Sequence, residues 1–339
     1  MFREASVELE IPMRDPVPLP VRIDPAVNES GLGFLLRASR ANGTSLAPML
    51  DDLGLPRSPW LTVPSISTFA YMMNVDRDWL AFATVIAGRR DGFRCFEWRG
   101  RLWTCPLSLR GKYPQICPRC LRESGICLVD WELAGSVACL RHGCPLIDGC
   151  PHCGRRLSWL RPAVDVCSCG HYLWVDSAAE PGDAMGAWVR ILVGNASDSG
   201  APRVTLTYGL PPWFSVLSSD ALTAIAFSFG VRDEPFERVT SAIATVPPST
   251  HRMTAIIERA LIRLRRAHDL AVPCPSDLRL CVYEQALWRL WRRHADPADR
   301  DAAARILLWL GARTGQKGAP ITAPGSDQRE LFALLGGDE

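Results

Sequence analysis

Hydrophobic residues recur at helical spacing through residues 29–92 and predict four short helices. The first begins near Glu29 and ends at Asn42-Gly43, and Thr44 or Ser45 can cap a second that runs to Leu53. Ser65 can cap the third and Asp76 the fourth. Their expected buried faces are Leu32, Leu35, Leu36 and Ser39; Ile66, Phe69, Ala70 and Met73; and Trp79, Leu80, Ala83 and Ile86. This pattern fits a helix-turn-helix module, and it fits equally well four helices that only pack together.

The rest of the chain alternates between turn-rich and helical segments. Residues 1–28 contain five prolines and predict an extended leader. Residues 93–116 predict short strands with a turn at Arg99–Arg101, and a cysteine-rich segment follows to about residue 175. Beyond a linker at residues 177–183, helices are expected at 184–195, 218–230, 234–245, 252–268, 277–294, 298–312 and 327–335.

These segments predict a mainly α fold with small zinc-ribbon or knuckle β elements. The expected domains are an extended leader (1–28), an N-terminal helix-turn-helix-like domain (29–92), a zinc-finger region with two zinc sites (93–175), a C-terminal helical domain (176–314) and a loose tail with a short helix (315–339).

Composition supports a globular protein with more than one domain. The chain has 339 residues, of which 47% are hydrophobic and 22% charged, and its net charge is only +2. No apolar run reaches the roughly 18–20 residues that a membrane span needs. The N-terminus lacks the basic-then-apolar order of a signal peptide. We therefore expect a cytoplasmic protein without a membrane partner.

The cysteines carry the strongest chemical signal. Cys117 and Cys120, then Cys139 and His142, supply the four ligands of a closed Cys₃His zinc site. A second set, Cys150 and Cys153 followed by Cys167 and Cys169, supplies four thiolates. Glycines at 143, 154 and 170 come directly after three of these pairs, where a knuckle turn needs positive φ. The sequence therefore predicts two zinc ions per chain, with Cys127, Cys144, His152 and His171 as spare ligand candidates.

Spacing leaves two zinc topologies open. Sequential sites keep each set of four together, whereas a cross-brace joins residues 117 and 120 to residues 150 and 153. The ligand order resembles a RING finger, but seven residues separate His142 from Cys150, which favours sequential sites. Both sets have four ligands, and no hydrolase, deaminase or nucleotide-binding motif occurs in the sequence. We therefore expect no enzyme.

Several of these stretches together resemble the TniQ family of transposon target selectors. The resemblance covers roughly residues 18–175 and rests on residues 28–37 with Asn42-Gly43, residues 117–121, Trp131, residues 139–143 with Leu146, residues 150–154 with Leu157, and residues 167–170 with Leu173. It implies a protein that selects or reports a transposition target and recruits an AAA+ ATPase regulator, which brings in the transposase.

The resemblance leaves the mode of target choice open. Some members of the family read a DNA sequence directly, and others sit on a guide-RNA effector complex of a CRISPR-associated transposon. The chain has about 160 residues after the zinc region, which favours the shorter adaptor type. The alternatives are a stand-alone sequence-specific DNA-binding selector or regulator and, from a different class, a RING-like ubiquitin ligase. The resemblance also implies a homodimer.

Arginines gather on two predicted C-terminal helices. They are Arg252, Arg259, Arg263 and Arg266 on the helix at 252–268, and Arg289, Arg292 and Arg293 near the end of the helix at 277–294. Arginines on one helix face are typical of phosphate contact with DNA or RNA. A solvated face with cations near the helix C-terminus would have the same pattern.

Overall fold

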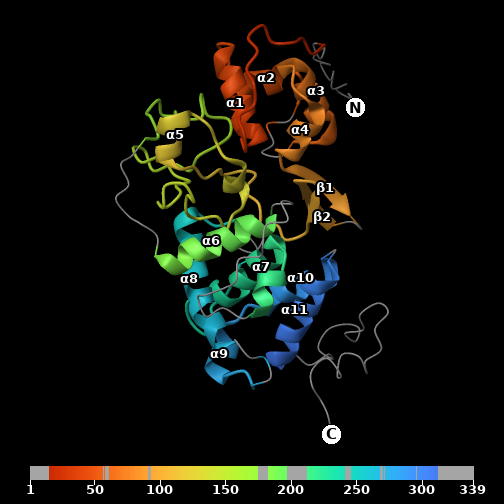
Figure 1. Ribbon diagram of the computed structural model, residues 1–339, viewed down its shortest axis with the longest axis vertical. Coiled ribbons are helices and arrows are strands. Elements are labelled where there is room, and N and C mark those ends of the chain that lie inside the picture. Colours follow the sequence, from red (N-terminus) through yellow and green to blue (C-terminus); the bar gives the residue numbers. More distant parts are fainter. Residues whose placement is uncertain are drawn as a thin grey trace, which may run out of the picture. The chain divides into compact units, whose positions relative to one another are not determined.

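A computed structural model describes residues 15–55, 57, 61–90, 93–174, 182–196, 212–240, 246–267, 270, 272–294 and 296–311. The chain divides into two compact units (Figure 1). Unit 1 comprises Met1–Gly182 and Pro247–His251, and unit 2 comprises Asp183–Val246 and Arg252–Glu339. The predicted helix at 327–335, the first half of the leader and most of the linker at 177–183 lie outside the described residues.

Four helices open unit 1, in the order the hydrophobic pattern predicts. They are α1 (Gly31–Ala41), α2 (Leu46–Asp52), α3 (Val63–Met73) and α4 (Arg77–Phe82). The Asp76 carboxylate accepts from Trp79 N–H and caps α4 as predicted. The cap of α3 is Thr62, whose hydroxyl accepts from Ser65 N–H. The prediction of Ser65 as the cap was therefore wrong by three residues.

A three-stranded antiparallel sheet follows α4, and its first strand was not predicted. β1 (Ile86–Arg90) pairs with β2 (Phe93–Trp98), which pairs with β3 (Arg101–Trp103). Ile86 was expected on the fourth helix, but α4 ends at Phe82 and Ile86 lies opposite Glu97 in the sheet. The indoles of Trp98 and Trp103 pack edge to face, 5.3 Å apart between centroids, and both residues are buried.

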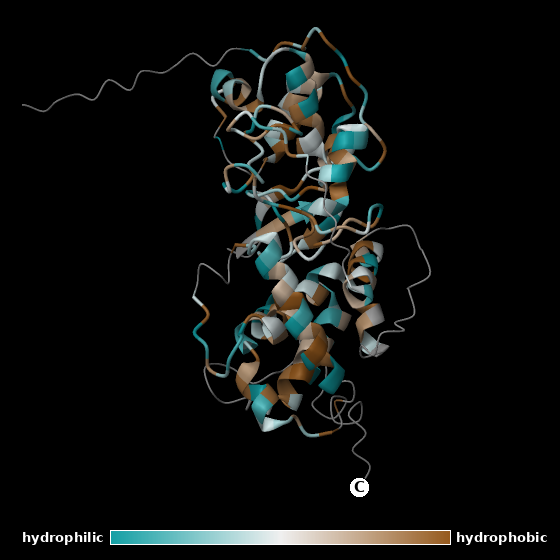
Figure 2. Cartoon of the chain, turned by 90° about the vertical axis from the view of Figure 1, so that its left-hand side faces the viewer, coloured by the Kyte–Doolittle hydropathy of each residue, from teal (hydrophilic) through white to brown (hydrophobic). Residues whose placement is uncertain are grey.

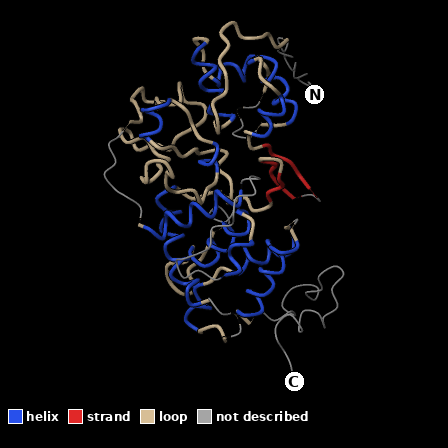
Figure 3. Tube along the Cα trace, in the orientation of Figure 1, coloured by secondary structure: helices blue, strands red, loops and turns tan. Residues whose placement is uncertain are grey.

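The cysteine-rich segment has little regular structure, and Figure 3 draws most of it as loop. It contains α5 (Pro118–Ser124), a 3₁₀ helix (Val129–Glu132) and isolated bridges between single residues. One hydrophobic core joins this segment to the helices, since it includes side chains of α1 and α3 together with cysteines of both sets. Cysteine therefore takes the place of larger apolar residues in part of this core.

A buried arginine holds the short return segment of the chain in unit 1. The Arg110 side chain is 1% exposed and forms an ion pair with Asp148, at 3.1 Å. Its second terminal nitrogen donates to the Pro248 carbonyl at 3.0 Å. Nearby, the Thr250 hydroxyl donates to the Gln115 side chain at 3.0 Å. Residues 247–251 are thus fixed in unit 1 by buried polar contacts.

Unit 2 is helical throughout its described residues apart from connecting loops. Its helices are α6 (Asp183–Ala196), a 3₁₀ helix (Pro212–Val216), α7 (Ser219–Gly230), α8 (Thr250–Arg266, whose first two residues belong to unit 1), α9 (Ser276–Cys281), α10 (Glu284–Arg293) and α11 (Pro297–Trp309). Every residue of α7 is buried, and α7 contacts α6 and α10. The other long helices carry hydrophobic and hydrophilic residues side by side, as the hydropathy colouring of Figure 2 shows.

Two helix predictions in unit 2 were wrong. Residues 234–240 form no helix, because Pro235 interrupts the segment and Phe236 has a left-handed φ of 62°. The single helix expected at 277–294 is divided into α9 and α10. At the break, Tyr283 N–H donates to the Ser228 carbonyl of α7 at 2.8 Å instead of continuing a helix. No helix among the described residues has the length and apolar character needed to cross a membrane.

Candidate metal centres and arginine faces

The four predicted ligands of the first site meet in one cluster. The Sγ atoms of Cys117, Cys120 and Cys139 and one nitrogen of His142 all lie within 4.8 Å of one another. His142 Nδ1 is 3.4 Å from Cys117 Sγ and 3.1 Å from Cys120 Sγ. The Sγ atoms of Cys120 and Cys139 are 3.6 Å apart.

Local backbone structure brings each ligand pair into position. Cys117 precedes α5, and its Sγ accepts from Cys120 N–H at 3.4 Å, which turns both sulfurs toward one point. Cys139 and His142 lie in a tight turn closed by a bridge between Ala138 and Pro145. Gly143 continues this turn with φ of 57°, as its place after the ligand pair predicted.

A carboxylate that the sequence did not reveal supports His142. Glu123 accepts from His142 Nε2, with both of its oxygens within 3.0 Å, while Nδ1 faces the sulfurs. Such an outer carboxylate fixes the tautomer and orientation of a ligating imidazole. Glu123 follows Cys120 by three residues on α5. This spacing, which places Glu123 one helical turn after a ligand, was the available signal in the sequence, although no known motif includes Glu123.

The second predicted set also forms one cluster. The Sγ atoms of its four cysteines lie within 4.8 Å of one another, with 3.7 Å between Cys150 and Cys169 and 3.9 Å between Cys153 and Cys167. The Arg155 backbone N–H lowers the pKa of the Cys153 thiol to about 6, which favours the thiolate. Two small hairpins, closed by the bridges Gly149–Arg156 and Val166–Tyr172, hold the pairs.

Both clusters have the dimensions of a tetrahedral zinc site. With Zn–S near 2.3 Å and Zn–N near 2.0–2.1 Å, tetrahedral ligand atoms are separated by roughly 3.8 Å for two sulfurs and roughly 3.6 Å for sulfur and nitrogen. The sulfur separations given above are 3.6 Å in the first cluster, and 3.7 and 3.9 Å in the second. His142 Nδ1 is 3.1–3.6 Å from the three sulfurs of the first cluster, so its ring is slightly closer to Cys120 than in the ideal geometry. The donor sets, Cys₃His and Cys₄, are those of structural zinc. The clusters can therefore hold two metal ions.

The spare candidates lie around these clusters. Cys144 Sγ is 3.5 Å from Cys117 Sγ, and burial raises the pKa of Cys144 to about 12, so it remains a neutral thiol. Cys127 is buried beside Arg161, and burial raises its pKa to about 11. The exposed rings of His152 and His171 stack on each other with centroids 3.4 Å apart.

The topology of the two clusters is sequential. Residues 117 and 120 meet residues 139 and 142, and residues 150 and 153 meet residues 167 and 169. A RING-like cross-brace requires residues 117 and 120 to meet residues 150 and 153. In the described residues these two pairs belong to different clusters. The RING-like ubiquitin ligase alternative is therefore wrong in its main structural expectation.

The comparison with protein families identifies the N-terminal part of the chain. The family model described as TniQ matches residues 20–146. The chain carries a TniQ domain. The match begins in the leader and ends four residues beyond His142, so the TniQ domain contains the first cysteine cluster and the second cluster follows it. No curated protein matches the chain significantly.

The TniQ domain places the chain among transposition-associated target-selection proteins. It confirms the predicted resemblance over a shorter stretch than the roughly 18–175 on which that resemblance was based. The arginines predicted to bind nucleic acid, and all of α8 and α10, lie outside it.

Three arginines of α8, downstream of the TniQ domain, have partners within unit 2. Arg263 donates to the carbonyls of Phe229 and Arg232, at 2.7 and 2.8 Å, and Arg259 donates to the Gly230 carbonyl at 2.8 Å. Arg266 forms a two-bond ion pair with Asp277. Arg259 and Arg263 thus satisfy carbonyls at and just beyond the C-terminal end of α7. Arg252 is exposed on the first turns of α8.

The arginines of α10 have different surroundings. The Arg292 guanidinium lies over the rings of Trp288 and Trp291, at 5.3 and 5.9 Å from their centroids. The two indoles meet edge to face at 5.5 Å. Burial, together with the positive charges of Arg289 and Arg292, lowers the pKa of Arg293. Three positive charges are therefore close together at the C-terminal end of this helix.

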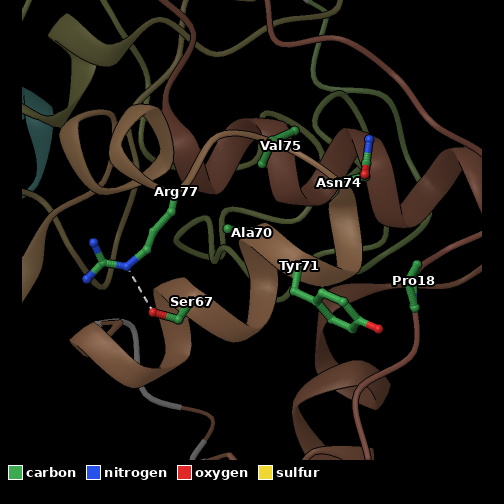
Figure 4. Close-up of a pocket in the computed structure, with 7 residues that line it drawn as sticks. All are labelled: Pro18, Ser67, Ala70, Tyr71, Asn74, Val75 and Arg77. Carbon is green, nitrogen blue, oxygen red and sulfur yellow. Dashed lines mark hydrogen bonds between the residues drawn. The ribbon is translucent and has the colours of Figure 1, made fainter.

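A pocket of about 390 Å³ lies on the TniQ domain where the leader passes α3 (Figure 4). The Tyr71 ring points toward Pro18, and Arg77 Nε donates to the Ser67 hydroxyl at 3.0 Å. The remaining residues that line the pocket are Ala70, Asn74 and Val75. None of the residues that line it is a carboxylate, a histidine or a cysteine, so the lining offers no metal ligand set and no acid–base pair.

Proposed function

We propose that the chain is an adaptor in transposition target selection. It links target DNA, or an effector complex that carries a guide RNA, to an AAA+ ATPase regulator and through it to the transposase. The observation that carries the proposal is the TniQ domain, whose C-terminal part contains a preformed Cys₃His cluster. The function is binding, and the chain performs no turnover chemistry.

Zinc in both clusters has a structural role in this proposal. Four protein ligands close the coordination sphere and leave no position for a reacting water. Because the cysteines belong to the core of unit 1, metal binding stabilises the surface that partners contact. The helix-turn-helix reading of α1–α4 and the homodimer are parts of the same proposal that rest on the family resemblance.

A transposition assay in cells tests the adaptor function. Cells carry the transposon with its own ATPase and transposase genes, with or without the gene for this chain. We expect site-selective insertion only when the chain is present. Insertion of unchanged frequency and site distribution without the chain would contradict the proposal.

Two cysteine variants connect the assay to the metal clusters. Cys139→Ser removes a ligand of the first cluster and is expected to abolish selective insertion. Cys274→Ser changes a half-buried cysteine outside both clusters and is expected to leave insertion unchanged. Equal insertion activity of the two variants would show that selective insertion does not need the first cluster.

The second candidate is a stand-alone selector that reads DNA by itself. The arginines near the C-terminal end of α10 favour it, since arginines on a helix can contact phosphates beside a sequence-reading element. Binding of purified protein to a target duplex and to a scrambled duplex separates the two functions. Strong preference for the target duplex indicates a stand-alone selector, and equal binding indicates an adaptor.

A further inference from the structure

A fifth cysteine, Cys144, lies against the first metal cluster without belonging to it. Cys144 is 2% exposed, and its Sγ is 3.5 Å from Cys117 Sγ. Among the described residues, Cys117 is the only hydrogen-bond partner of this thiol. Cys144 is not one of the four residues whose ligand atoms all lie within 4.8 Å of one another. Its thiol therefore contacts one ligand of a site that already has four.

The turn that carries His142 also positions Cys144. Cys139 N–H donates to the Cys144 carbonyl at 2.8 Å, and Gly143 N–H donates to the Cys139 carbonyl at the same distance. Residues 139 and 144 therefore face each other across the turn. Cys144 is also part of the hydrophobic core of unit 1, and this packing keeps its side chain beside the cluster.

A metal ion in the first cluster would make the Cys117 sulfur a hydrogen-bond acceptor in a buried place. Three thiolates and a neutral imidazole around a divalent ion leave one net negative charge. The three ligating cysteines are between 0% and 2% exposed, and a charge at such depth needs hydrogen-bond donors. Cys120 N–H is one donor to Cys117 Sγ, at 3.4 Å. A thiol that binds no metal carries one weak S–H donor, and the Cys144 thiol is within reach of the same sulfur.

We propose that Cys144 donates an S–H···S hydrogen bond to the Cys117 thiolate of the metal-loaded first cluster. Cys144 is then a positioning residue and not a replacement ligand. It stabilises a ligating sulfur, as Glu123 orients the ligating imidazole of His142. Outer partners of this kind change metal affinity by about 10–100-fold. The proposal concerns the first cluster alone and does not depend on the adaptor function.

Cobalt(II) in place of zinc tests this hydrogen bond, because sulfur-to-cobalt charge-transfer bands report on the ligating sulfurs. The full chain is loaded with Co²⁺, and the unaltered second cluster contributes equally to every spectrum. Cys144→Ala and Cys144→Ser both lose the sulfur, but only Ser keeps a donor. Cys127→Ala is the control, since Cys127 is a buried cysteine of the same core outside both clusters. Zinc affinity is measured in parallel by competition with a chromophoric chelator.

We expect Cys144→Ala to move the charge-transfer bands to longer wavelength, because a thiolate that has lost a donor gives up an electron more easily. The zinc affinity of the first cluster should fall about 10-fold, at the lower end of the range for outer partners, since a thiol is a weak donor. Cys144→Ser should stay closer to the wild type in both measurements. Cys127→Ala should leave the bands in place, even where it lowers the melting temperature.

Other results would overturn the proposal. Equal band shifts in the Ala and Ser variants would mean that Cys144 acts through packing alone. Wild-type bands and wild-type zinc affinity in Cys144→Ala would mean that the thiol does not support Cys117. Weaker charge-transfer bands in Cys144→Ala, which indicate one cobalt–sulfur bond fewer, would make Cys144 a ligand. Each of these results leaves the cell assay free to decide the adaptor function.

Discussion

Glu132 gives a quantitative test of the packing in unit 1. It ends the 3₁₀ helix Val129–Glu132 and is 2% exposed. Oε1 of its carboxyl group is hydrogen-bonded to the Ser30 hydroxyl, and Oε2 has no hydrogen-bond partner among the described residues. Burial raises the pKa of Glu132 from 4.5 to about 8. The folded chain therefore prefers the protonated, neutral side chain.

The sign of the pH dependence follows from this shift. The unfolded chain releases the proton near pH 4.5 and the folded chain near pH 8, so the free energy of unfolding falls as pH rises between these values. At about 1.4 kcal/mol per pKa unit, the full loss is on the order of 5 kcal/mol. Glu132→Gln keeps the shape and removes the charge, so this variant should lack that loss.

Urea unfolding of the metal-loaded chain at several pH values between 6 and 9, followed by tryptophan fluorescence, measures the effect. The variant should gain stability over the wild type as pH rises, with the largest gain at and above pH 8. Thiolate ligands bind metal more weakly at low pH in both proteins, so the difference between them isolates Glu132. Glu97→Gln, at an exposed position of β2, is the matched control. Parallel pH profiles for wild type and Glu132→Gln would refute the reasoning.

Three further changes test other parts of the chain. Metal analysis should find two zinc ions per wild-type chain, and Cys139→Ser should lose one and unfold at lower temperature. Glu123→Ala removes the carboxylate that accepts from His142 and should weaken zinc binding about 10–100-fold, measured in competition with a chromophoric chelator. Unchanged zinc affinity would show that Glu123 does not support the first cluster. Gly230→Ala places a Cβ 1.9 Å from the Ile256 carbonyl oxygen and should destabilise unit 2 by about 3 kcal/mol, measured as a lower urea midpoint at constant m; wild-type stability would contradict this close helix packing.

Features set by neighbours in sequence were the ones that could be predicted. The helices of unit 1 depend on capping residues and on the helical spacing of apolar residues, which the sequence shows directly. The knuckles depend on ligand pairs followed by glycine, which the sequence also shows directly. β1 was missed because its short run, Ile86–Arg90, continues the apolar spacing of α4 and shows no clear alternation.

Features set by distant partners could not be predicted. The break before α10 exists because Tyr283 N–H bonds to a carbonyl of α7. The roles of Arg259 and Arg263 depend on carbonyls about thirty residues away, so the sequence could not distinguish these side chains from the arginines of α10. Glu123 supports His142 across a turn of the fold that spacing alone does not show.

The return of residues 247–251 to unit 1 determines how the chain can be divided. The polypeptide passes from one unit to the other after residues 182, 246 and 251, so no single cut yields two complete halves. A fragment that ends at residue 182 would keep the TniQ domain and both cysteine clusters, yet the buried guanidinium of Arg110 would lose its bond to the Pro248 carbonyl. Such a fragment needs residues 247–251 supplied as a peptide or fused through a linker.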